Sequence, residues 1–75
     1  MKVEALTANW CPKCRQAKEI LQDYSINWID YNSPTGMAII RTFKVENIPV
    51  FIINGESKTH SIYKVRDLFE DAKEA

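Results

Sequence analysis

Cys11 and Cys14 are the residues with the clearest chemistry in this chain, and they are its only cysteines. They stand three positions apart in Trp10-Cys11-Pro12-Lys13-Cys14, after an apolar run and at the start of a helical pattern. Two thiols at this spacing can close into a disulfide and reopen, which stores and releases an electron pair. The first hypothesis is therefore reversible thiol-disulfide chemistry.

The start of a helix favours the thiolate of Cys11. If Cys11 caps the helix, Pro12 takes the first helical position, where its missing N–H is no loss and its fixed φ is already helical. The N–H groups of Lys13 and Cys14 then lack intrahelical partners and point towards the sulfur. The helix dipole and the Lys13 ammonium both stabilise negative charge there. We therefore expect Cys11 to be the attacking sulfur, with Pro12 and Lys13 supporting its ionised form.

Cys14 has a different expected role. It lies one turn into the helix, further from the unpaired N–H groups and closer to the core, so its thiol should stay protonated until it attacks a mixed disulfide. Cys14 is thus the expected resolving cysteine. The alternative is an inert disulfide staple, but closing so short a ring stabilises a protein by only about 2 kcal/mol on the loop-entropy model.

Metal binding is a second alternative for the same sulfurs. A structural zinc site takes four ligands, and beyond the two cysteines the chain offers only His60, far off in the sequence. We therefore expect no zinc site within a monomer. Two-coordinate Cu(I) prefers thiolates, so a Cu(I)-binding module of the metallochaperone kind is the alternative function.

Length and composition describe one small domain, residues 1–75, with no linker or repeat to divide it. A chain of this size buries roughly 60% of its unfolded surface, so we expect a thin core. Ten basic and ten acidic residues cancel to zero net charge. Neither nucleic acid nor an anionic membrane is an expected partner, because each calls for a basic patch.

Cellular location is predicted from the N-terminus and the cysteine content. Residues 1–6 are too short, and carry an acid too early, for a secretory signal. No apolar run approaches the roughly 20 residues needed to span a bilayer. In a reducing compartment two cysteines favour catalytic or metal use over a disulfide framework. We therefore expect a cytoplasmic protein, acting as a monomer.

Apolar periodicity predicts four elements in the first half of the chain. Residues 2–8 alternate as a strand, and a helix follows from Pro12 to about Tyr24. Residues 26–31 read as a second strand, parallel to the first because a whole helix separates them. Ser33 then caps a second helix with Pro34 at its first position, running to about Phe43.

The second half predicts a hairpin and a terminal helix. Residues 49–53 form a third strand, and Asn54-Gly55 is a strong hairpin signal that pairs it with residues 57–62. A helix follows from about Lys64. The order βαβαββα predicts an α/β fold with a four-stranded mixed sheet flanked by helices. Cys11 then lies at the C-terminal end of a parallel strand, where open α/β sheets place their sites.

Four other residues have weaker signals. Trp10 either lines a substrate groove or shelters the Cys11 sulfur from water. Tyr31 is expected to pack on the sheet, and Gly36 to weaken the first turn of its helix. His60 is expected on the second strand of the hairpin, away from the cysteines, with no catalytic or ligand role.

Three segments resemble the thioredoxin superfamily, and most closely its glutaredoxin branch. Residues 7–14, followed by residues 17–21, resemble the family's Cys-Pro-aromatic-Cys motif and the Ala-Lys-x-Leu-Leu stretch after it. Residues 48–52 resemble its Val-Pro-x-Val-Phe-Ile segment, and Asp67-Leu68 its entry to the last helix. The resemblance implies a thioredoxin-like fold over essentially the whole chain.

The resemblance also implies a site and an activity. It implies a cis Ile48-Pro49 bond beside the cysteines, with the Ile48 backbone holding an extended substrate peptide or glutathione. Trp10 and Pro49 join Ile48 as the expected substrate-binding residues. The implied activity is a thiol-disulfide oxidoreductase, a dithiol electron carrier that reduces protein or small-molecule disulfides.

The implied activity needs no metal and no cofactor beyond glutathione, should glutathione be the reductant. The family's Gly-Gly pair is missing near residues 63–67. The electron donor is therefore either glutathione or a thioredoxin-reductase-like flavoenzyme. Copper carriers of the alternative class use a βαββαβ order, whereas this chain is expected to end on a helix and has Pro12 between its sulfurs. Both features favour the redox hypothesis.

Overall fold

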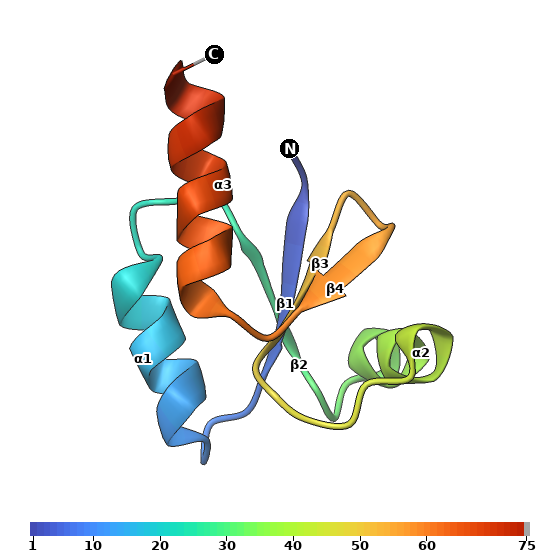
Figure 1. Ribbon diagram of the computed structural model, residues 1–75. Coiled ribbons are helices and arrows are strands. Elements are labelled where there is room, and N and C mark those ends of the chain that lie inside the picture. The colour runs from blue at the N-terminus through green and yellow to red at the C-terminus, as the bar shows by residue number, and fades with distance from the viewer. Residues whose placement is uncertain (75) are drawn as a thin grey trace.

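The computed structural model describes residues 1–74 and shows, within them, a four-stranded sheet with helices on both faces (Figure 1). The predicted order βαβαββα and the α/β class are confirmed. The strands are β1 (Val3–Thr7), β2 (Asn27–Asp30), β3 (Val50–Ile53) and β4 (Ser57–Thr59), and the helices are α1 (Pro12–Ile20), α2 (Pro34–Phe43) and α3 (Ile62–Glu74).

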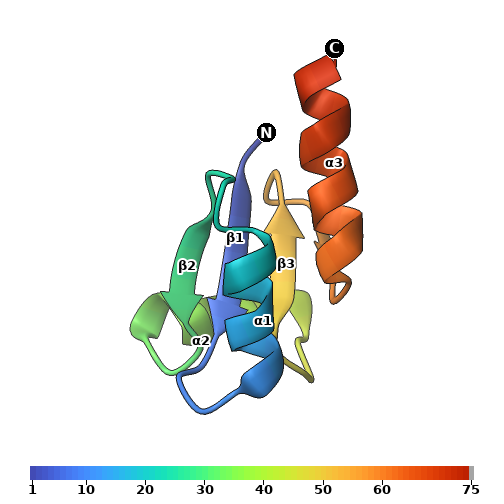
Figure 2. The ribbon, with the colours of Figure 1, turned by 90° about the vertical axis from the view of Figure 1, so that its left-hand side faces the viewer.

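The sheet is mixed, as predicted, with the strand order β2-β1-β3-β4. β1 pairs in parallel with β2 and antiparallel with β3, and β3 pairs antiparallel with β4. Helices α1 and α3 cover one face, and α2 crosses behind the other (Figure 2). The C-terminal ends of β1 and β2 therefore lie together at one edge of the sheet, where β1 leads into α1.

Two thin apolar layers hold these helices to the sheet, because strand side chains alternate between its faces. The layer under α1 and α3 is centred on Phe51, and the layer under α2 on Leu6. The α2 side chains that pack against this second layer are only partly buried; they are Ile39, Ile40 and Phe43. Since α2 buries little apolar surface, the contacts at its two ends matter for its position.

Several element boundaries differ from those predicted. Each of the first three strands is shorter than expected, and α1 ends at Ile20 instead of near Tyr24. Leu21 caps α1, and the Tyr24 N–H donates to the Leu21 carbonyl at 3.1 Å, which forms a tighter turn. That turn keeps Leu21 in the core and lets Tyr24 stack on Phe69 of α3, with ring centroids 4.8 Å apart.

The predicted strand over residues 57–62 is also too long, since β4 ends at Thr59 and α3 begins at Ile62 instead of Lys64. Between β4 and the first turn of α3, polar groups form hydrogen bonds with one another and not with a neighbouring strand. The Ser61 N–H donates to Thr59 Oγ1, and Ser61 Oγ accepts from the Lys64 N–H, each at 3.2 Å. Ser61 therefore satisfies one of the free N–H groups at the start of α3.

The Asn54-Gly55 turn is confirmed, because both residues adopt the positive φ that this dipeptide accommodates, at 54° and 69°. The Glu56 N–H donates to the Ile53 carbonyl at 3.1 Å. Asn54 also fastens the start of the chain, because its Oδ1 accepts from the Lys2 N–H at 2.9 Å. The turn thus joins β3, β4 and the residue before β1.

Both ends of α2 are held by specific side chains. Ser33 Oγ accepts from the Gly36 N–H at 3.0 Å, with Pro34 at the first helical position, which confirms the predicted cap. At the other end Lys44 has a left-handed φ of 53°, and Lys58 Nζ of β4 donates to the Phe43 carbonyl at 2.7 Å. Lys58 also reaches the Lys44 carbonyl, so it caps α2 from another strand.

Gly36 is required by packing, which the sequence interpretation missed. A Cβ atom at this position would lie 2.2 Å from the Asp30 carbonyl oxygen and 2.9 Å from that of Tyr31. The first turn of α2 therefore lies directly against the backbone that follows β2. No side chain fits between them.

We predict that Gly36→Ala destabilises the fold by about 1–3 kcal/mol, because the added methyl pushes α2 away from backbone that cannot yield. Intrinsic helix propensity alone would make the same change stabilising by about 1 kcal/mol, so the sign of the effect is diagnostic. Urea denaturation of the wild type and the variant measures it. A higher denaturation midpoint in Gly36→Ala would contradict the close approach.

Candidate functional site

Cys11 occupies the capping position at the start of α1, as predicted. Its backbone is extended, with φ −91° and ψ 114°, and its Sγ accepts a hydrogen bond from the Cys14 N–H at 3.3 Å. The Cys11 N–H donates to the Ala8 carbonyl at 3.2 Å, which fixes the bend from β1 into the helix. Pro12 is the first helical residue. The sulfur therefore faces the positive end of the helix dipole.

Lys13 is exposed, and the hydrogen bond recorded at the Cys11 sulfur comes from Cys14. Among the described residues no N–H bond from Lys13 reaches that sulfur. The direct contact is thus a single backbone N–H, and the supporting role of Lys13 stays a prediction. The sulfur therefore accepts one backbone N–H, where the sequence predicted two.

The two thiols are free and unequally buried. Cys11 is 6% exposed and Cys14 is 1% exposed. Burial, followed by a side-chain hydrogen bond with Cys11, raises the pKa of Cys14 to about 11. Cys14 is therefore a protonated thiol at neutral pH, which is the state that a waiting second thiol needs.

Four segments of the chain meet at the cysteines. Ala8 from the end of β1 forms a small buried cluster with Cys11 and Cys14, and Tyr31 and Ile48 pack against it. Tyr31 directly follows β2, and its N–H donates to the Thr7 carbonyl at 2.9 Å. The sulfurs thus have the apolar neighbours Ala8, Tyr31 and Ile48.

The Ile48-Pro49 bond is cis, as the resemblance implied. Pro49 is buried, and the side chain of Ile48 packs against the cysteine cluster. The structure therefore brings Ile48 against Cys11 and Cys14, from which it is far apart in the sequence. The part that the Ile48 backbone plays in substrate binding stays a prediction.

Trp10 borders a groove that it shares with Ile48, which packs against the cysteine cluster. Its side chain is 64% exposed, and its ring meets that of Tyr31 edge to face, with centroids 5.9 Å apart. A hollow of about 190 Å³ lies between Trp10, Tyr31 and Ile48, with Ile40, Val45, Glu46 and Asn47 completing its wall. Trp10 therefore lines a groove, and its part in substrate binding stays a prediction.

Tyr31 packs against the sheet, as expected, and it also has a place at the site that the sequence interpretation missed. It touches the cysteine cluster, Trp10 and the groove together. A sequence signal for this was available. Because β1 and β2 are parallel, the residue after β2 ends at the same edge of the sheet as the residues after β1.

The expectation for His60 was wrong in position. His60 follows β4 and does not lie in it, and its Nδ1 is 3.1 Å from the Pro49 carbonyl oxygen, so the ring donates to the cis-proline segment. Phe51 pairs with Thr59, and extending this register sets Pro49 opposite Ser61. The Ser61 N–H donates to Thr59 Oγ1 instead. The His60 ring therefore donates to the Pro49 carbonyl in place of a backbone N–H from that strand.

We predict that His60→Leu destabilises the fold by about 1 kcal/mol, because the partly buried Pro49 carbonyl loses its donor. His60→Asn is the matched control, since its side-chain amide offers a donor at a similar reach and should retain most of the stability. Thermal unfolding of the three proteins measures the difference. Equal losses in both variants would show that ring packing matters and the hydrogen bond does not.

Within the described residues, no helix has the length and apolar character needed to cross a membrane. No three His, Cys, Asp or Glu side chains in that part of the chain gather into a group that could hold a metal ion.

One solved structure shares this architecture. The crystal structure of a mutant of the thioredoxin-like protein BC3987 matches it with a TM-score of 0.73, covering 91% of this chain and 99% of that one. The two sequences are 22% identical, a level at which the likeness concerns the fold. No protein-family model and no curated protein matches the sequence.

Proposed function

Since the chain has a thioredoxin-like fold, we propose that it is a thiol-disulfide oxidoreductase that reduces protein or small-molecule disulfides through Cys11 and Cys14. One observation carries the proposal, the hydrogen bond from the Cys14 N–H to Cys11 Sγ at the start of α1. A thiolate is the nucleophile in disulfide exchange, and that bond together with the helix dipole stabilises the thiolate of Cys11.

In the first step, the Cys11 thiolate attacks one sulfur of a substrate disulfide. A bond forms between Cys11 and that sulfur, the substrate S–S bond breaks, and the departing thiolate takes a proton from water. The protein and half of the substrate are then joined in a mixed disulfide. The slight exposure of Cys11 beside the groove allows a substrate sulfur to reach it.

In the second step, Cys14 loses its proton and attacks Cys11 Sγ, which releases the reduced substrate and leaves a Cys11–Cys14 disulfide. The pKa of Cys14 is raised in part by its hydrogen bond with Cys11. Once Cys11 is in a mixed disulfide it no longer carries negative charge. The Cys14 proton is then held less tightly, so the resolving thiol becomes reactive when it is needed.

The cycle closes when an outside donor returns two electrons and two protons to the disulfide. The donor is glutathione or a thioredoxin-reductase-like flavoenzyme, and no resident cofactor is required. Supplying oxidised protein with either system and following NADPH consumption identifies which one it is. We place this reaction in a monomer in the cytoplasm, where thiols are kept reduced.

We predict that Cys11→Ser abolishes disulfide reduction, because it removes the attacking sulfur. Cys14→Ser should still attack, because the backbone N–H at position 14 remains, but it should stop at the mixed disulfide. Insulin reduction measures the first effect. Mass spectrometry of Cys14→Ser treated with a disulfide substrate measures the second, as one substrate half bound to Cys11 per chain.

Two results would contradict this proposal. An active Cys11→Ser protein would overturn the assignment of roles. A protein purified under reducing conditions that holds one copper ion and reduces no disulfide would favour the alternative Cu(I)-carrier function.

A further inference from the structure

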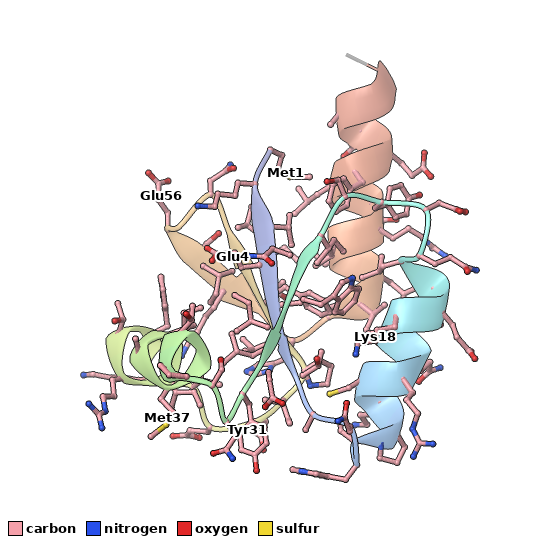
Figure 3. All side chains as sticks on the ribbon, turned by 180° about the vertical axis from the view of Figure 1, so that it is seen from behind. Met1, Glu4, Lys18, Tyr31, Met37 and Glu56 are labelled. Carbon is pink, nitrogen blue, oxygen red and sulfur yellow. The ribbon has the colours of Figure 1, made fainter. Side chains whose placement is uncertain are left out.

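A second hollow adjoins the groove beside Cys11, on the side of α2. It has a volume of about 260 Å³, and Met37 and Arg41 lie in its wall. Tyr31 and Ile40 line both hollows, so the two lie side by side along one surface. Figure 3 shows Tyr31 and Met37 close together at the same end of the molecule. The surface therefore runs from Trp10, beside the cysteines, to Arg41 on α2.

This surface is apolar and exposed at both ends. Among the described residues, the large apolar side chains with the most exposure include Trp10, at 64%, and Met37, at 45%. Trp10 borders the first hollow and Met37 the second. Single exposed apolar side chains are ordinary, but here two of them flank a shared floor of Tyr31 and Ile40. The flexible thioether of Met37 suits contact with varied side chains.

The dimensions favour an extended polypeptide over an enclosed small molecule. Each hollow is smaller than the roughly 300 Å³ at which pockets for whole small molecules begin. Successive side chains on one side of an extended chain, in contrast, can enter neighbouring hollows one at a time.

Charge distinguishes the two ends of the surface. Arg41 is exposed in the second hollow, and Glu46 is exposed at the first. The ion pair found among the described residues joins Arg66 to Asp67, so within that part of the chain neither Arg41 nor Glu46 forms an ion pair. An acidic group is therefore favoured beside Arg41 and disfavoured beside Glu46.

Arg41 has a simpler explanation, since cations are favoured in the last turn of a helix. However, Lys58 already donates to the carbonyls of Phe43 and Lys44 at that end of α2. The helix end is thus supplied with a cation without Arg41. The Arg41 guanidinium remains available to a group outside the chain.

We infer that this surface binds an extended polypeptide substrate with an apolar residue near its reactive cysteine and an acidic residue further along, facing Arg41. The inference rests on the proposed function and adds the class of substrate. The first hollow takes the apolar side chain, while Met37 and Arg41 of the second hollow select the acidic residue. Arg41 acts in this scheme as a specificity-determining residue.

The test uses synthetic peptides whose one cysteine is in a mixed disulfide with 2-nitro-5-thiobenzoate. Attack by Cys11 on the peptide sulfur forms the protein-peptide disulfide and expels the thiobenzoate, which is the better leaving group and absorbs visible light. Each peptide has leucine beside the cysteine. One Glu is moved through successive positions on either side, and each Glu peptide has a Gln and a Lys counterpart.

The readout is the second-order rate constant for thiobenzoate release in a single turnover of the reduced protein, taken as the ratio between Glu and Gln peptides within each protein. In the wild type we expect the best-placed Glu to raise this rate constant about two- to fivefold, the range for an exposed ion pair, and the gain to shrink at high salt. In Arg41→Gln the ratio should fall to about 1, and in Arg41→Glu the Lys peptide should be preferred. Arg66→Gln on α3 is the matched control and should keep the wild-type ratio.

The outcomes separate the two proposals. If the wild type releases thiobenzoate from none of the peptides, the proposed function is wrong. If it reduces Glu, Gln and Lys peptides equally well at every position, or if Arg41→Glu keeps the wild-type preference, the function stands and the docking inference is wrong. A dimer that hides Trp10 in sedimentation and fluorescence experiments, with no peptide preference, would make a second copy of this chain the occupant and would also overturn the inference.

Discussion

The site depends on one contact, the hydrogen bond from the Cys14 N–H to Cys11 Sγ. It exists because α1 begins at Cys11, so that the first N–H groups of the helix have no backbone partner. Three other features maintain that start. Pro12 supplies a helical φ without needing a partner for an N–H, the Ala8 carbonyl holds the Cys11 N–H, and β1 brings the chain to the edge of the sheet.

The same helix makes the two sulfurs chemically different. Positions 14 and 17 face the sheet, where Cys14 and Ala17 are buried, whereas position 11 lies at the helix end, where backbone N–H groups are exposed to it. Burial raises the pKa of Cys14 and holds it as a thiol, whereas the sulfur of Cys11 accepts the Cys14 N–H. Under the proposed function, Cys11 at the helix end is the attacking sulfur and Cys14, three residues further on, is the waiting one.

The features predicted correctly from the sequence were those that depend on near neighbours in the chain. Ser33 and Pro34 mark the start of α2, Asn54-Gly55 marks the turn, and Pro12 marks the start of α1, because each acts through its own backbone torsions or a partner three residues away. The resemblance supplied the cis Ile48-Pro49 bond, which is a rare state that chain statistics alone do not predict.

The features that were missed depend on partners distant in the sequence. Gly36 is needed because the backbone after β2 lies in the space that a Cβ atom would fill. His60 matters because its ring donates to the Pro49 carbonyl across the hairpin. The role of Tyr31 follows from the parallel pairing of β1 and β2, and the second hollow exists only because α2 lies beside Tyr31. Helix and strand propensities and apolar periodicity describe near neighbours in the chain, so they do not predict contacts between distant segments.

The central claim is that the start of α1 holds Cys11, and not Cys14, as a thiolate. Ultraviolet thiolate absorbance at neutral pH tests it directly, with the wild type, Cys11→Ser and Cys14→Ser compared in the folded state. We expect a thiolate signal in the wild type and in Cys14→Ser, and none in Cys11→Ser. A wild-type protein with no thiolate until alkaline pH, or a signal that survives in Cys11→Ser, would contradict the account.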